Sequence, residues 1–189
     1  SIGHGVREIR EAMIAQLEAI EFAHPSRWVT KASVEAAEQV ASIAPEGLSH
    51  VWLVSGGSEA IESAMKLSRQ YFVERDGAGS AKSVYIARWN SYHGSTIATM
   101  ALAGSMARRR TFSPIFTESP KIEAHYCYRC PYGKTYPECD ILCARKLENE
   151  IRRIGPQYAA AFVAEPVVGS TVGALNPPPE YWPIIREIC

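Results

Sequence analysis

The chain has 189 residues, of which 47% are hydrophobic, so it is long enough to bury the core of one domain or slightly more. Its 20 Lys and Arg residues balance 20 Asp and Glu residues, and this zero net charge argues against a nucleic-acid partner held by a basic surface. No stretch approaches the about 20 apolar residues of a membrane span, and residues 1–11 lack the apolar segment of a signal peptide. We therefore expect a cytoplasmic protein without a membrane partner.

The basic run Arg108-Arg109-Arg110 is expected to be a solvated loop, with an anion contact as the alternative.

The first part of the chain shows helical periodicity. Apolar residues recur every three or four positions over residues 6–22, and Pro25 ends the pattern because the residue before a proline is pushed out of the α region. A second helical pattern covers residues 33–44 and stops at Pro45. Residues 1–45 are therefore predicted to be an N-terminal helical segment, and residues 46–189 a larger domain.

Strand and helix patterns alternate through that larger domain. Short apolar runs bounded by turn residues predict strands at residues 50–55, 83–88 and 159–165. Helical patterns occupy residues 58–73, 95–103, 141–154 and 181–189. This alternation indicates βαβ units, and hence an α/β fold with a mostly parallel sheet covered by helices on both faces.

The loop after the first predicted strand is a candidate site, because ligands of open α/β sheets bind outside the carboxyl ends of the strands. Gly56 and Gly57 allow a sharp turn, and Ser58 opens a helix whose N-terminal N–H groups suit a phosphate. The same residues suit an ordinary helix cap, and both interpretations stay open. Lys66 falls on the polar face of this helix, four residues after Glu62, and is predicted to be a solvated surface residue.

The next two strand ends supply an aromatic ring and a carboxylate. Tyr92-His93-Gly94 follows the second strand, where the ring can stack on a flat heterocycle or belong to a surface turn. Glu165 ends the third strand, where a carboxylate is either a site residue or a member of an ion pair. Together, the three strand ends match the needs of pyridoxal phosphate, which has a phosphate, a flat pyridine ring and polar groups around its edge.

Four of the five cysteines cluster at Cys127, Cys130, Cys139 and Cys143, and the fifth is Cys189. Thiolates at such spacings can close a zinc site. The second pair, however, has three intervening residues and runs into a predicted helix, and the segment between the pairs is rich in Pro and Tyr, as a packed loop would be. Free thiols are therefore the preferred interpretation, and no metal site is predicted.

Several segments resemble one known family. SGGSEAIESAMKLSRQYF, ARWNSYHGST and AAFVAEPVVGSTVGALNPPPEYWPIIREIC resemble successive blocks of the class III (omega-type) pyridoxal-phosphate-dependent aminotransferases, and CYRCPYGKTYPECDILCARKLENEI resembles an insert of one branch. The resemblance covers about residues 22–189. It implies a fold type I transferase that is normally a homodimer with active sites at the subunit interface, of which this chain would be an incomplete large domain.

The resemblance assigns cofactor contacts to residues at all three strand ends: Gly57 and Ser58, then Tyr92, His93 and Gly94, then Glu165. The first pair would hold the phosphate. The tyrosine would stack on the pyridine ring with the histidine and glycine beside it, and the glutamate would lie near the ring edge and help to hold the next site residue.

Two residues of the family pattern have no counterpart here. They are the aspartate that pairs with the pyridine nitrogen and the lysine that binds the cofactor covalently, which both follow the last matching block. We therefore expect part of an aminotransferase that moves an amino group from an amine or ω-amino acid to a 2-oxo acid, inactive as 189 residues alone. The alternatives are an aminomutase or decarboxylase-type relative, a zinc-binding interaction module, and a scaffold without cofactor.

Overall fold

A computed structural model describes residues 2–189 and divides the chain into two units, with the boundary between Leu53 and Val54. The boundary lies later in the chain than the one expected between residues 45 and 46. Every helix within the described residues is too short or too polar to cross a membrane.

The first unit contains the two predicted helices, α1 (Arg7–Ala19) and α2 (Lys31–Ile43). A reciprocal cap begins α2, because Thr30 Oγ1 accepts the N–H of Ser33 and Ser33 Oγ accepts the N–H of Thr30, each at 3.1 Å. The apolar residues that produce the periodicity of α1 are exposed: Ile9, Met13, Leu17 and Ile20.

The strand predicted at residues 50–55 is wrong. These residues have no regular structure, and Trp52 is 83% exposed. An apolar run becomes a strand only where a neighbouring strand pairs with its N–H and C=O groups. None of the strand pairings among residues 2–189 includes this segment.

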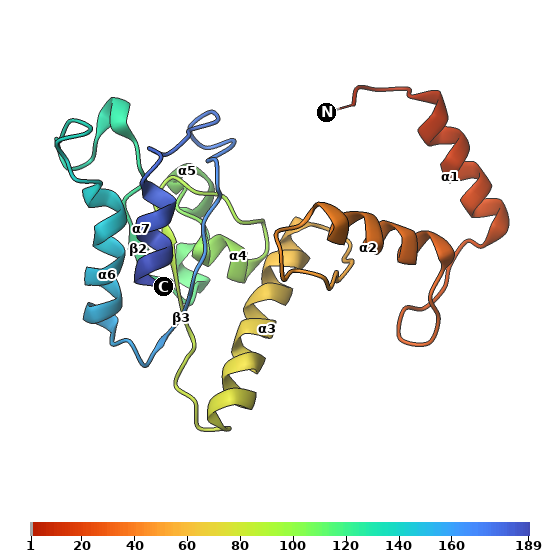
Figure 1. Ribbon diagram of the computed structural model, residues 1–189, viewed down its shortest axis with the longest axis horizontal. Coiled ribbons are helices and arrows are strands. Elements are labelled where there is room, and N and C mark those ends of the chain that lie inside the picture. The colour runs from red at the N-terminus through yellow and green to blue at the C-terminus, as the bar shows by residue number, and fades with distance from the viewer. Residues whose placement is uncertain (1) are drawn as a thin grey trace. The chain divides into compact units, whose positions relative to one another are not determined.

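The second unit is built on a parallel sheet in the order β2-β1-β3 (Figure 1). The predicted strands at residues 83–88 and 159–165 are confirmed as β1 (Val84–Arg88) and β3 (Ala159–Phe162). The strand β2 (Lys121–Ile122) escaped prediction because two residues are too few to show a periodicity. Backbone hydrogen bonds from Ala87 to Pro120 (3.0 Å) and from Trp89 to Ile122 (2.9 Å) hold it against β1.

Helices cover both faces of this sheet, as predicted (Figure 1). They are α3 (Gly57–Asp76), α4 (Ile97–Leu102), α5 (Met106–Arg109), α6 (Leu142–Ile154) and α7 (Tyr181–Ile188). Successive side chains of a strand point to opposite faces. Ile86 of β1 packs in the core with Leu147 of α6 and Tyr181 of α7, whereas the neighbouring Tyr85 donates its hydroxyl to the Met65 carbonyl of α3 at 2.6 Å.

The arginine run is not the solvated loop that its charge suggests. Arg109 is the last residue of α5 and is 4% exposed, and its Nη2 donates to the Glu118 carboxylate at 2.6 and 2.7 Å. Its guanidinium also lies 5.7 Å from the centre of the Trp89 ring. A charged side chain can be buried when its charge is paired and its flat group packs on a ring, and both conditions hold here. Arg108 and Arg110 are exposed.

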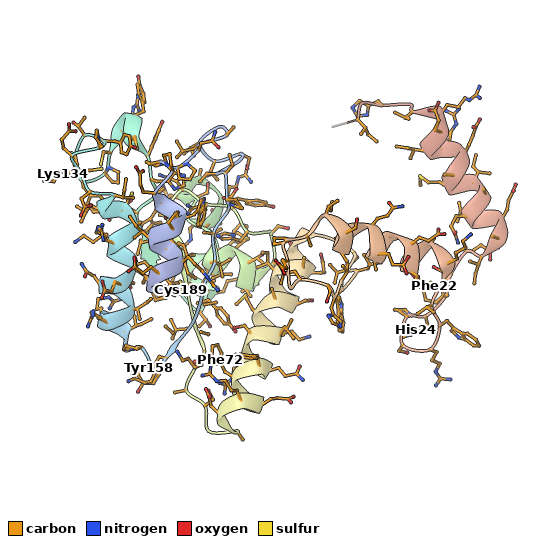
Figure 2. All side chains as sticks on the ribbon, viewed as in Figure 1. Phe22, His24, Phe72, Lys134, Tyr158 and Cys189 are labelled. Carbon is orange, nitrogen blue, oxygen red and sulfur yellow. The ribbon has the colours of Figure 1, made fainter. Side chains whose placement is uncertain are left out.

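The segment that carries Cys127, Cys130 and Cys139 forms irregular structure between β2 and α6, with a short 3₁₀ helix, η2 (Cys127–Arg129), and Cys143 lies in α6. Lys134 lies in this segment, at the end of α6 opposite Tyr158 (Figure 2). All five cysteines are free thiols. Within the described residues, no group of three or more His, Cys, Asp or Glu side chains has the geometry to hold a metal ion.

Candidate active site at the carboxyl ends of β1 and β3

The N-terminus of α3 and the loops that follow β1 and β3 are joined by hydrogen bonds. Ser58 Oγ at the start of α3 accepts the N–H of Ser95 at 3.0 Å. The carboxylate of Glu165, after β3, accepts the N–H of Tyr92 at 2.9 Å. The structure therefore brings together the three chain segments that the sequence placed at strand ends.

The N-terminus of α3 is open toward solvent at Gly57. The N-cap is Gly56, in extended backbone, and no side chain caps the helix, so Ser58 is not the cap that one interpretation of the sequence required. A Cβ atom built on Gly57 would meet no atom within 4 Å. The first N–H groups of a helix have no partner within the helix, and they carry its partial positive charge. This end of α3 can therefore accept an anion such as a phosphate.

Gly94 lets the loop after β1 approach α3 closely. Its φ of +139° lies where glycine is favoured, and a Cβ atom there would lie 2.6 Å from Thr99 Oγ1 and 2.7 Å from Ser58 Oγ. Glu62 of α3 contributes to the same contact, because it accepts a hydrogen bond from the hydroxyl of Thr96. Glu62 thus turns toward this loop, while Lys66 is exposed, as predicted.

The carboxylate of Glu165 holds two loops at once. Its Oε1 accepts from Tyr92, and its Oε2 accepts the N–H of Gly169 at 2.9 Å. None of the ion pairs among residues 2–189 includes Glu165, so the ion-pair interpretation of the sequence is not supported. Backbone N–H donors stabilise the charged form of a carboxylate, and here they also fix its position.

Tyr92 and His93 differ sharply in exposure. The Tyr92 ring is 37% exposed, and the guanidinium of Arg108 lies 4.7 Å from its centre. His93 is 7% exposed, and its Nε2 has no hydrogen-bond partner within the described residues. Burial lowers the pKa of His93, partly offset by the nearby negative charge of Glu165, so the ring is neutral at pH 7. A buried nitrogen without a partner is suited to hydrogen bonding with a ligand.

Arg88 belongs to this region, although sequence reasoning missed it. It ends β1 and is fully buried, and its Nη2 donates to the Glu165 carbonyl at 2.5 Å. The alternation of side chains along a strand could have indicated its burial. Arg88 lies two residues after the buried Ile86, so both side chains point to the same, inward face of β1.

These features define a class of protein: a parallel α/β domain in which an open helix N-terminus lies beside the ends of two strands, which carry an aromatic ring and a fixed carboxylate. The sequence profile of the family "Aminotransferase class-III" matches residues 1–189, and the chain belongs to this family.

Known relatives agree with this assignment. The chain is 36% identical over 189 residues to the uncharacterized aminotransferase YodT of Bacillus subtilis (100% of this chain, 42% of the relative). It is 34% identical to the putrescine–pyruvate aminotransferase of Pseudomonas aeruginosa (100% and 41%). A crystal structure of the omega transaminase from Pseudomonas jessenii in complex with PMP has a TM-score of 0.88 at 30% identity, covering 98% of this chain and 41% of that one. The chain thus spans about two fifths of the length of these proteins.

Pyridoxal phosphate is the cofactor of class-III aminotransferases, and the residues present fit its parts. The open N-terminus at Gly57 suits the phosphate, the partly exposed Tyr92 offers a ring face, and the Nε2 of His93 lacks a partner among the described residues. Lys121 differs from these residues, because its amine already has partners. It donates to the carbonyls of Ala101 and Ser119 at 2.8 and 2.9 Å and is therefore not free to contact the cofactor.

Proposed function

We propose that this chain is the cofactor-holding part of an aminotransferase that moves an amino group from an amine or ω-amino acid to a 2-oxo acid. Bound pyridoxal phosphate supplies the electron sink that such a transfer needs. The observation that carries the proposal is the junction, through Ser58, Tyr92 and Glu165, of the N-terminus of α3 with the segments that follow β1 and β3. The putrescine–pyruvate specificity of one relative supports a primary amine as donor and a 2-oxo acid as acceptor.

Each predicted site residue has a part in this proposal. The N–H groups of Gly57 and Ser58 hold the phosphate, because they lie at the open end of α3. The ring of Tyr92 stacks on the pyridine ring. His93 lies beside the ring and offers its unpartnered Nε2, and Gly94 keeps this loop close to α3. Glu165 fixes the backbone of Tyr92 by a hydrogen bond, and thereby the position of the ring that stacks on the cofactor.

The resemblance supports further features of the whole protein: a homodimer in the cytoplasm, with no nucleic-acid or membrane partner. It also puts the lysine that binds the cofactor covalently outside these 189 residues. We therefore expect the 189-residue chain alone to show no transamination, because none of its lysines lies in a segment that matches the family's lysine motif.

Titration of the whole protein with pyridoxal phosphate tests the proposal. We expect saturable binding, and production of alanine when a primary amine and pyruvate are added. Tyr92→Ala should weaken cofactor affinity about fivefold, since stacking of aromatic rings contributes about 1 kcal/mol beyond buried area. Lys66→Ala, on the exposed face of the same helix, should leave the affinity unchanged. A wild-type protein that fails to bind the cofactor would exclude the proposed function.

A further inference from the structure

The guanidinium of Arg88 is a positive charge inside the core of the second unit. Arg88 is fully buried, and none of the ion pairs among the described residues includes it. Burying a charge without a counter-charge is costly unless hydrogen bonds and polarisable groups replace the lost water. The surroundings of Arg88 must therefore supply that compensation, and they connect it to the site.

Two hydrogen bonds and two rings surround this charge. Nη1 lies 2.9 Å from His125 Nδ1, and Nη2 donates to the Glu165 carbonyl at 2.5 Å. The guanidinium carbon lies 5.8 and 5.5 Å from the ring centres of Tyr181 and Trp182 of α7. Nitrogen Nε has no hydrogen-bond partner within the described residues. The side chain is thus held by contacts with His125, with α7 and with the loop that follows β3.

The proton of His125 can be assigned from this geometry. A guanidinium only donates hydrogen bonds, so Nδ1 of His125 must accept and the ring proton must be on Nε2. Nε2 lies 3.4 Å from the Leu175 carbonyl, which can accept that proton. His125 is 1% exposed, and burial, together with the charge of Arg88, lowers its pKa to about 4. A neutral ring with one defined tautomer agrees with the acceptor role.

Arg88 and His125 hold the two ends of one loop. Arg88 binds the carbonyl of Glu165, where the loop begins, and His125 faces the carbonyl of Leu175, where it ends. Between them the loop is closed by paired backbone hydrogen bonds of Val168 and Leu175 at 2.9 and 3.0 Å. The carboxylate of Glu165, which extends from this same loop, accepts the N–H of Tyr92.

We propose that Arg88, acting with His125, is a positioning residue of the cofactor site that sets the 165–175 loop so that Glu165 holds the Tyr92 backbone. The proposal rests on the proposed function, since its consequence is the placing of the cofactor ring. Lysine is a poor replacement for arginine here, because its three N–H donors share one nitrogen, whereas two separate nitrogens of the planar guanidinium reach His125 and Glu165.

Variants of the whole protein separate positioning from general stability. We compare Arg88→Lys and Arg88→Met with Leu147→Ala, which removes a fully buried side chain of α6 that makes none of these contacts. The readouts are the pyridoxal phosphate dissociation constant, the visible circular dichroism of the bound cofactor and the melting temperature without cofactor. Both Arg88 variants should bind about tenfold to a hundredfold more weakly, with Lys the milder, since a charged hydrogen bond is lost. Their visible circular dichroism should fall as the ring loses its fixed orientation.

The control variant Leu147→Ala separates a loss of stability from a loss of cofactor positioning. Leu147→Ala should lower the melting temperature while keeping wild-type cofactor affinity and circular dichroism. Arg88 variants that bind the cofactor as tightly as this control would overturn the positioning role while leaving the proposed function standing. Failure of the wild type to bind would instead remove the proposed function.

A measurement on the unmodified protein decides the matter even when Arg88→Met does not fold. Nitrogen-15 NMR of histidine-labelled protein without cofactor, at neutral pH, should show His125 protonated at Nε2 and unprotonated at Nδ1. A proton on Nδ1 would exclude the hydrogen bond from Arg88 and overturn the proposal.

Discussion

Gly94 lies where the backbone has a φ of +139° and where a side chain would meet two hydroxyl oxygens. Gly57 has neither constraint, because a Cβ atom built there meets open space. The two glycines therefore serve the site for different reasons. Gly94 makes possible the close approach of two chain segments, while Gly57 keeps the end of α3 open to an anion.

Gly94→Ala should lower the free energy of unfolding by about 1–3 kcal/mol, because the new methyl group meets Thr99 and Ser58 in a backbone region that alanine rarely adopts. Gly57→Ala, the matched control, should change it by less than about 0.5 kcal/mol. Urea unfolding of the protein without cofactor measures both values. Equal effects of the two substitutions would contradict the assigned geometry of Gly94.

His125 makes stability depend on pH in one direction. Burial, with the charge of Arg88 next in importance, lowers its pKa from 6.5 to about 4, so the folded protein binds the proton more weakly than the unfolded chain. The contribution of the neutral His125 ring to the free energy of unfolding is complete above pH 6.5 and is lost as the pH falls toward about 4. At 1.36 kcal/mol per pKa unit the loss is about 3 kcal/mol.

The free energy of unfolding, measured between pH 7 and pH 4, checks this expectation. His125→Gln removes the titrating group, so its stability should fall less steeply than that of the wild type over this interval. The carboxylates titrate alike in both proteins, so their effect cancels when the free energy of unfolding of one protein is subtracted from that of the other. Parallel curves would show that His125 carries no such shift.

At the scale of elements, sequence periodicity was most reliable where an element is long or is paired within the chain. The helices α1, α2, α3 and α6 and the strands β1 and β3 lie close to their predicted positions. Residues 50–55 have the same apolar character as β1 but lack a paired neighbour, which no local pattern reveals. The burial of Arg109 likewise depends on Glu118 and Trp89, which come from other parts of the chain.

The candidate site shows the same division between local and long-range information. Strand-end position was enough to select Tyr92 and Glu165, whereas Ser58 was selected as following a strand that does not form. Hydrogen bonds still bring the three segments together. The partners of Arg88 lie 37 and 77 residues away along the chain, so no local spacing could reveal its role. Long-range polar contacts depend on the packed fold, and this is why the supporting residues were found only in the structure.

At the scale of the whole molecule, the four clustered cysteines offer an alternative from a different class, a zinc-binding module. Zinc binds thiolates, and burial raises the pKa of Cys143 to about 11 and also raises that of Cys127, so a zinc ion would have to displace the protons of both thiols at neutral pH. We therefore expect purified whole protein to contain less than stoichiometric zinc by mass spectrometry, and a chelator to leave its melting temperature unchanged. Pyridoxal phosphate at 100 times its dissociation constant should add about 2.7 kcal/mol of stability by mass action. Stoichiometric zinc, with a melting temperature that falls on chelation and does not rise with pyridoxal phosphate, would favour the module over the aminotransferase.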